Sequence, residues 1–231
     1  MKFKIKTPLA VAVCGWVSFL SLLPGRATAE EDKAKQVVEC LRTEYGDLPG
    51  FRVDYERTIQ TSSMVMLGGS GTGDHARGEI FFMPPHYLKI HQKEPREEIV
   101  TTNNEYLWWY IPDEKKVHRY RVEEVGKELR ALAEVFQGLK EVEESFVISW
   151  EGHTEAGDRK IQLVPNPPWA QTDHLTLTVT QGCRLRVVEI TSVVGDVTRF
   201  VLEGLQPMES LEEDFFRFEV PDGVRVINET P

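Results

Sequence analysis

The alternation of apolar side chains between residues 104 and 120 is the strongest pattern in the chain. It predicts two β-strands joined by a turn at Pro112 and Asp113. The first strand places its side chains on alternating faces: Tyr106, Trp108 and Tyr110 on one, and Leu107, Trp109 and Ile111 on the other. A strand that is apolar on both faces needs cover on both faces, and a large aromatic lining favours a concave apolar surface. The pattern therefore predicts a container for something hydrophobic.

Two amphipathic helices are predicted, at residues 30–45 and 122–142. The second carries apolar side chains at spacings of four and three residues, which is the period of one helix face: Val125, Leu129, Leu132, Phe136 and Leu139. The other regular segments are predicted strands with mostly short connections: residues 51–59, 78–83, 87–91, 98–102, 146–150, 160–164, 174–180, 184–191, 197–205 and 216–220.

Short connections favour antiparallel pairing of neighbouring strands, and only one long helix interrupts them. The sequence thus predicts a mainly β fold with some α-helix (α+β), built on one antiparallel sheet of about 11 strands. A flat sheet of this size would leave a wide apolar face uncovered, so we expect it to curl into a partial or whole barrel. The two helices then cover the open side, with residues 122–142 as an amphipathic lid.

Residues 1–29 have the organisation of a signal peptide. Basic residues precede an apolar run from Leu9 to Leu23, and Ala27-Thr28-Ala29 forms a small-x-small cleavage signal. The apolar run is too short and too broken for a comfortable membrane span. We expect cleavage before Glu30, export to the periplasm, and a single mature domain over residues 30–231. An uncleaved anchor is the alternative.

The whole chain carries a formal net charge of −10. The predicted signal peptide contains basic residues and no acid, so its removal makes the mature chain more negative. Such an acidic surface argues against binding to nucleic acid or to anionic lipid. Two cysteines remain after cleavage, Cys40 and Cys183. An oxidising compartment permits a disulfide between them, and two buried free thiols are the alternative.

Motifs that carry catalytic or cofactor chemistry are missing from the sequence. It contains no G-x-S-x-G, H-E-x-x-H, C-x-x-C or P-loop pattern. The six histidines are scattered without metal-ligand spacing. Acidic runs such as Glu212-Glu213-Asp214 are typical of a solvated surface. The sequence therefore indicates no catalytic residue, no metal and no cofactor, and leaves the aromatic side chains as site candidates.

Three segments follow each other in the order of a known family. Gly78-Glu-Ile-Phe-Phe-Met-Pro84 is similar to a Gly-strand-Arg-Pro segment, residues 103–112 to Asp-Gly-x-x-Leu-Trp-x-Tyr-x-Pro, and residues 216–226 to Phe-x-Phe-x-x-Pro-x-Gly-Val-x-Val. In these segments the chain resembles the LolA family of periplasmic carriers of outer-membrane lipoproteins. The resemblance implies an unclosed barrel with a helical lid and acylated lipoproteins as cargo. It also implies an inner-membrane lipoprotein-releasing transporter as donor and an outer-membrane lipoprotein receptor as acceptor.

For such a carrier, we expect the acyl chains to contact apolar side chains of the strands and the lid: Phe82, Leu88, Ile90, Trp108, Tyr110, Leu132, Phe136 and Ile148. One position departs from the family pattern. In the family pattern an arginine precedes the proline of the first segment, and the resemblance implies that this arginine forms hydrogen bonds with the lid. Here the position is occupied by Met83. A thioether fills space but does not clamp carbonyl groups, so the control of the lid differs at this position.

Three other functions remain open at this stage. The first is a carrier of free phospholipid or glycolipid, which differs from the leading hypothesis only in its cargo. The second is a domain that senses mislocalised lipoproteins, which would need a regulatory partner. The third is a lipid hydrolase, which would need a nucleophile with a base, and the sequence shows no such pair.

Overall fold

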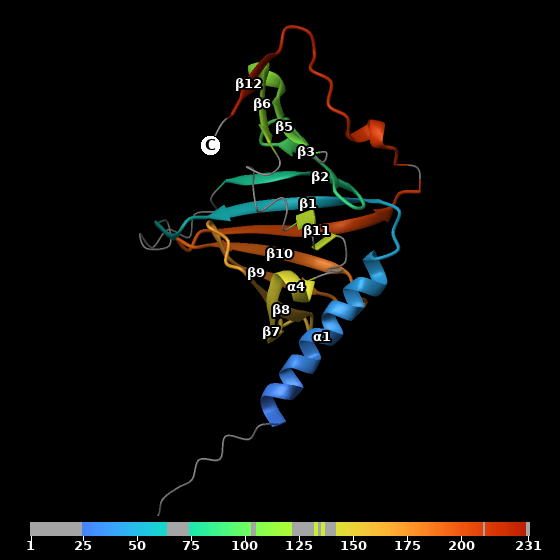
Figure 1. Ribbon diagram of the computed structural model, residues 1–231, viewed down its shortest axis with the longest axis vertical. Coiled ribbons are helices and arrows are strands. Elements are labelled where there is room, and N and C mark those ends of the chain that lie inside the picture. Colours follow the sequence, from blue (N-terminus) through green and yellow to red (C-terminus); the bar gives the residue numbers. More distant parts are fainter. Residues whose placement is uncertain are drawn as a thin grey trace, which may run out of the picture.

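The computed structural model describes residues 25–231, apart from 64–73, 103–104, 122–131, 134, 137–141, 210 and 230–231. One sheet of twelve strands organises this part of the chain (Figure 1). The strands are β1 (Phe51–Gln60), β2 (His75–Met83), β3 (Tyr87–Glu94), β4 (Glu98–Thr102), β5 (Tyr106–Ile111), β6 (Lys116–Arg121), β7 (Phe146–His153), β8 (Arg159–Pro165), β9 (Thr172–Val179), β10 (Leu185–Ser192), β11 (Val197–Pro207) and β12 (Arg225–Asn228).

The strand order is β12-β6-β5-β4-β3-β2-β1-β11-β10-β9-β8-β7. The order is linear, so β12 and β7 are the two edges and the sheet is unclosed. Two meanders, β1 to β6 and β7 to β11, are joined by the long antiparallel pair of β1 with β11. The predicted mainly β, antiparallel fold is confirmed. Among the described strands, the one parallel pair is that of β12 with β6.

The sheet has two distinct faces at the β1–β5 end. Cross-strand pairing aligns Val53, Ile80, Ile90, Val100 and Trp109 in one row over five consecutive strands. We call the face that carries this row the core face. The residues next to them in sequence point the other way, because side chains alternate along a strand. We call that second face, which carries Phe81 and Trp108, the outer face.

The glycine that begins the predicted strand at residue 78 is required by a close backbone approach. A Cβ atom at Gly78 would lie 2.1 Å from the carbonyl oxygen of His91 on the neighbouring strand β3. The pairing of β2 with β3 shifts register between Arg77 and Gly78, as at a β-bulge. A larger residue here would push β3, which carries part of the core face, away from β2.

Helix α1 (Gly25–Tyr45) packs across β7 and β8 at the other end of the sheet (Figure 1). It begins five residues before the predicted helix at residue 30. Ala34, Val37, Val38 and Leu41, which follow the predicted apolar stripe, are each only 1% exposed. The hydroxyl of Tyr45 accepts a hydrogen bond from the backbone N–H of Leu185 at 3.0 Å. The helix is thereby fixed to the start of β10.

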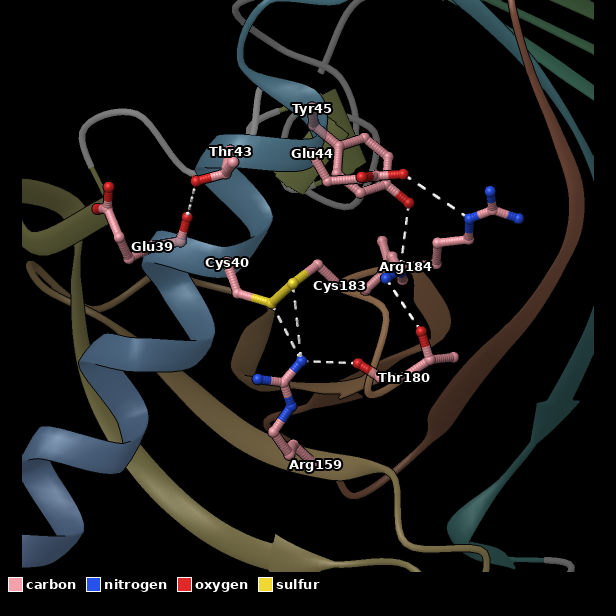
Figure 2. The surroundings of a disulfide bond; sticks show 10 residues. Glu39, Cys40, Thr43, Glu44, Tyr45, Arg159, Thr180, Cys183 and Arg184 are labelled. Carbon is pink, nitrogen blue, oxygen red and sulfur yellow. Dashed lines mark hydrogen bonds and ion pairs between the residues drawn. A yellow bond between two sulfur atoms is a disulfide. The ribbon is translucent and has the colours of Figure 1, made fainter.

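A disulfide bond joins Cys40 of α1 to Cys183 in the β9–β10 turn (Figure 2). This is one of the two states that the sequence left open. The two residues are 143 positions apart in the chain, and their Cα atoms are 5.3 Å apart. The bond therefore links the first helix covalently to the second half of the sheet.

The C-terminal part of the chain corrects one predicted strand. Residues 216–220 are not a strand: a 3₁₀ turn covers Glu213–Phe216, and the pairing strand is β12, at residues 225–228. The alternation of Phe216 and Phe218 fits a strand, but these rings serve as side-chain anchors instead. Phe216 packs on Tyr87 at 5.5 Å between ring centroids, and Phe218 stacks on Trp108 at 5.5 Å. We call residues 211–229, which run to β12 beside β6 (Figure 1), the C-terminal strap; its phenylalanine rings cover the outer face.

Most of the predicted lid helix, residues 122–142, lies outside the described residues. The described positions 132–133 and 135–136 are helical, and a short helix α4 (Val142–Ser145) precedes β7. Leu132, Val135 and Phe136 are at most 2% exposed. The ring of Phe136 lies 5.2 Å from that of Phe51 and 5.8 Å from that of Phe82, which places it over the core face of β1 and β2.

Candidate functional site

A cavity of about 230 Å³ opens beside the row of core-face residues. Its walls come from β1, β3, β4, β5, β11 and the helical residue Leu132. Most of the lining is apolar or aromatic, with a smaller polar part: Tyr55, Ile59, Ile90, Val100, Trp109, Leu132 and Phe200, and then Arg57, Gln92, Glu98 and Thr198. An apolar lining with a few convergent polar groups is the composition of small-molecule binding sites, which makes this cavity the candidate site.

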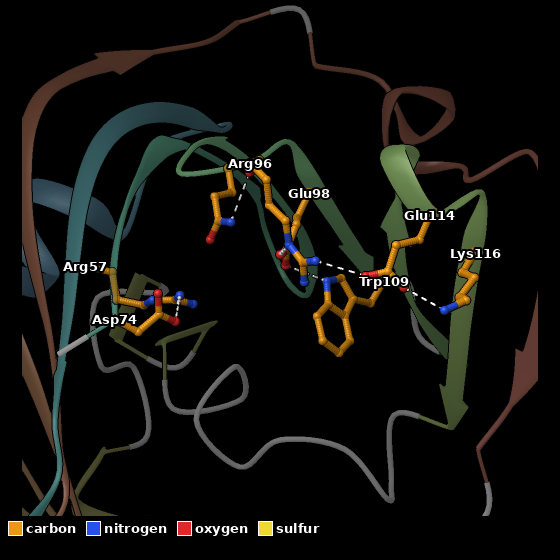
Figure 3. Close-up of polar contacts among 8 residues, drawn as sticks. Arg57, Asp74, Arg96, Glu98, Trp109, Glu114 and Lys116 are labelled. Carbon is orange, nitrogen blue, oxygen red and sulfur yellow. Dashed lines mark hydrogen bonds and ion pairs between the residues drawn. The ribbon is translucent and has the colours of Figure 1, made fainter.

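The indole of Trp109 is held in place on the cavity wall (Figure 3). Its Nε1–H donates to Oε2 of Glu98 at 2.8 Å, and Nε of Arg96 donates to Oε1 of the same carboxylate at 2.6 Å. Arg96 also donates to Glu114 at 3.0 Å, and Lys116 donates to Glu114 at 2.7 Å. Lys116 lowers the pKa of the Glu114 carboxyl by its hydrogen bond and its charge. This chain of contacts fixes the ring without filling the cavity.

The polar part of the cavity wall comes from four strands: Arg57 from β1, Gln92 from β3, Glu98 from β4 and Thr198 from β11. Arg57 donates through Nη2 to Asp74 at 3.0 Å, whereas its Nε is buried and has no hydrogen-bond partner among the described residues. Next to it, burial raises the pKa of the Tyr55 hydroxyl to about 12. The hydroxyl therefore stays neutral at physiological pH. The cavity thus combines an apolar floor with one cationic side chain at its margin.

Six of the predicted lipid-contacting residues lie on the core face or over it, at different places. Ile90 and Leu132 line the cavity. Phe82, Leu88 and Phe136 are at most 1% exposed and belong to the packed core. Ile148, on β7, is partly buried against the same core. The structure therefore gathers these side chains in one core, but only two of them face the cavity.

The other two predicted residues, Trp108 and Tyr110, lie on the outer face. Trp108 stacks on Phe218, and Tyr110 lies 5.7 Å from the same ring. The alternation along β5 is as predicted, and the strap covers the face that carries Trp108 and Tyr110. Contact of these two side chains with acyl chains stays a prediction. Trp109 takes the place of both in the candidate site.

Sequence reasoning missed Trp109, Tyr55 and Phe200 as lining residues. A signal for Trp109 was present in its own strand. Its neighbours on the same face, Leu107 and Ile111, are 5% and 3% exposed, whereas the face of Trp108 carries only aromatic residues with polar tips or edges. Aliphatic side chains mark the drier face of a two-sided strand, because they have no polar group to place at a margin.

Met83, the predicted lid-control position, is the last residue of β2 and pairs with Tyr87. By alternation it shares the outer face with Phe81, whereas Leu132 and Phe136 lie over the core face. Its role in controlling the lid stays a prediction.

Two further observations concern the described residues as a whole. They contain no group of three or more His, Cys, Asp or Glu side chains placed to hold a metal ion. None of their helices combines the length and the apolar character that crossing a membrane requires.

Comparison with known proteins identifies the family. Residues 64–219, more than half of the chain, match the family described as outer membrane lipoprotein carrier protein LolA. The chain belongs to the LolA family. The resemblance carried by the three sequence segments is thereby confirmed.

The names of the curated relatives agree with this assignment. The chain is 27% identical to an outer-membrane lipoprotein carrier protein of Pseudomonas aeruginosa (strain UCBPP-PA14) over 170 residues, which are 72% of this chain and 79% of the relative. It is 24% identical to one from Alkalilimnicola ehrlichii over 229 residues, or 98% and 96% of the two chains. A solved LolA superfamily protein from Nitrosomonas europaea aligns with a TM-score of 0.45 at 11% identity, covering 80% of this chain and 97% of that one.

Proposed function

We propose that this LolA family member is a non-enzymatic carrier that shelters the acyl chains of lipoproteins in the core-face cavity. The observation that carries the proposal is an apolar cavity walled by a fixed indole, Trp109, and covered by the helical residue Leu132. Burial of each methylene group stabilises a bound chain by about 0.8 kcal/mol. An acylated cargo therefore has a strong driving force to enter, without any covalent chemistry.

The size of the cavity supports a gated mechanism. Its volume of about 230 Å³ lies below the roughly 300–1,000 Å³ of sites that enclose a small ligand. Two or three acyl chains need more room, so loading requires Leu132 and Phe136 to move off the core face. Because both side chains are fully buried here, the closed state regains their burial once the cargo leaves. Closure thus favours release to an acceptor.

The family supports the wider route. We propose that the chain, after removal of residues 1–29, works in the periplasm. It receives lipoproteins from an inner-membrane lipoprotein-releasing transporter and passes them to an outer-membrane lipoprotein receptor. The names of the relatives, outer-membrane lipoprotein carrier proteins, support lipoproteins as cargo.

Release of lipoproteins from spheroplasts tests the proposal. Delipidated protein is incubated with spheroplasts whose lipoproteins carry a labelled acyl chain, and label in the supernatant is measured. We expect Leu132→Asp to reduce release at least tenfold, since it places a charge in the apolar cover. Val194→Asp, at a position that is 67% exposed, is the matched control and should release as much as the wild type.

Two outcomes would contradict the proposal. One is equal release by the wild type and Leu132→Asp when circular dichroism shows that both are folded. The other comes from mass spectrometry of the protein purified with its cargo. A bound acylated protein supports the lipoprotein route, whereas free phospholipid or glycolipid alone would replace it with a lipid carrier.

A further inference from the structure

A second pocket lies at the opposite end of the sheet from the cavity. It has a volume of about 160 Å³ and sits between α1 and the β7–β8 hairpin. Its lining shares no residue with the first cavity: Lys33, Gln36, Val37, Trp150, His153 and Arg159. The carrier mechanism proposed above assigns it no role.

The charge of this pocket is opposite to that of the chain. The sequence has 37 acidic and 27 Lys or Arg residues, yet the pocket lining contains Lys33, Arg159 and His153 and no carboxylate. Within the described ranges, none of these three side chains forms an ion pair, whereas many other basic side chains do, such as Lys35 with Glu31. The three come from three separate elements, so the fold, not a basic run in the sequence, brings them together.

Arg159 is anchored by contacts with the surrounding fold. One terminal nitrogen, Nη2, donates to the carbonyl oxygen of Thr180 at 2.7 Å and lies 3.0 Å from Sγ of Cys40. Its Nε is buried and has no hydrogen-bond partner among the described residues. Figure 2 draws no contact from the other terminal nitrogen to the residues shown. The guanidinium is therefore anchored on one side and keeps donors available on the other, which reduces the entropy lost when it binds an anion.

Trp150 holds the other two basic side chains. Nζ of Lys33 lies 5.8 Å from the centroid of the indole, and the ring of His153 meets it edge-on at 4.9 Å. Attraction between the ring and the ammonium group keeps Lys33 at the pocket without neutralising its charge. The pocket thus presents several N–H donors around a flat apolar wall.

We propose that this pocket binds an oxyanion of the phosphate class, held by Lys33 and Arg159 with His153 at the margin. Charge-assisted hydrogen bonds from a guanidinium and an ammonium group are the contacts that phosphate oxygens form in proteins. A pocket of about 160 Å³ has the volume of roughly five water molecules, which suits one phosphate group but not an acyl chain. The phosphate can be free in solution or part of a lipid head group.

Calorimetric titration of the delipidated full chain with inorganic phosphate tests the site. We expect one saturable site with a Kd on the order of 1 mM, weakened by added sodium chloride. Lys33→Gln should weaken binding at least fivefold. Lys35→Gln is the matched control, because it removes the same charge from the same helix outside the pocket, and it should leave the Kd unchanged.

A second titration, with a water-soluble short-chain phosphatidic acid, separates the two sources of the phosphate. Tighter binding than inorganic phosphate, with the same loss in Lys33→Gln, identifies a lipid head group, and equal affinity identifies a free anion. The proposal is overturned if neither ligand binds saturably, or if Lys33→Gln binds both ligands as the wild type does. Lipoprotein release from spheroplasts needs no phosphate in this pocket, so either proposal can fail without the other.

Discussion

Replacement of Trp109 by alanine should weaken lipid binding far more than replacement of Trp108, although the two residues are adjacent. Trp109 lines the cavity, and Trp108 stacks on Phe218 of the C-terminal strap. The two variants remove the same side chain from the same strand. Any difference between them therefore reports which face of β5 meets the cargo.

The size of the effect follows from the area of the indole. An enclosed Trp buries about 150–250 Å², and one side of Trp109 already packs on His118 at 5.3 Å, which leaves about 100 Å² for an acyl chain. At about 25 cal/mol per Å², this area stabilises the bound chain by about 2.5 kcal/mol, or roughly 70-fold in Kd. Trp109→Phe should lose less, because a ring remains on the wall.

A fluorescent diacyl lipopeptide serves as the ligand, and its Kd is measured for the wild type, Trp109→Ala and Trp108→Ala. Urea unfolding of each variant is measured in parallel. Trp108→Ala should lower the free energy of unfolding, since the strap loses its stacking partner, but should leave the Kd within a factor of about three. Equal losses of affinity in the two folded variants, or a larger loss in Trp108→Ala, would refute the placement of the site on the core face.

Two further predictions concern stability. Replacing Cys40 and Cys183 together with serine should lower the free energy of unfolding by about 3–5 kcal/mol, because the bond closes a loop between residues 143 apart; an unchanged midpoint in non-reducing urea would contradict this. Burial raises the pKa of both Tyr45 and Tyr55 to about 12. Above the ordinary tyrosine pKa of about 10, the unfolded state releases these protons while the folded state keeps them. The free energy of unfolding therefore falls by roughly 3 kcal/mol per residue as the pH rises from about 10 to 12. Tyr45→Phe should flatten this fall in urea titrations across that range, and an equally steep fall in the variant would count against the buried hydroxyl.

The strands of the sheet could be predicted because their pattern is local. Residues 51–59 and 87–91 alternate apolar side chains toward the core face, and each lies within an observed strand; the predicted strand at 98–102 matches β4. Antiparallel order follows from short connections in the same way. The predicted sheet is therefore correct over most of its length, since each strand carries its own evidence for burial on one side.

The choice between the two faces of β5 could be predicted only in part from the strand itself, because it also depends on a distant segment. The strap decides it: Phe218, about a hundred residues further along the chain, covers Trp108 and Tyr110. The alternation of Phe216 and Phe218 also led to the incorrect prediction of a strand at residues 216–220. Aromatic side chains at alternate positions give the same sequence pattern in a paired strand and in an unpaired segment whose rings pack on a neighbouring sheet.

The need for two covers on β5 favours the core face as the place of the proposed cargo site. The strap is fixed over the outer face by backbone pairing of β12 with β6, by the burial of Phe216, and by Lys89, whose ammonium donates to the Phe215 carbonyl at 3.2 Å. Uncovering that face would break a strand pair. On the core face, the described contacts of Leu132 and Phe136 are those of apolar side chains, which separate from the sheet without breaking a ladder. An acyl chain that replaces them restores the burial they lose, so the cost of opening is offset only on this side.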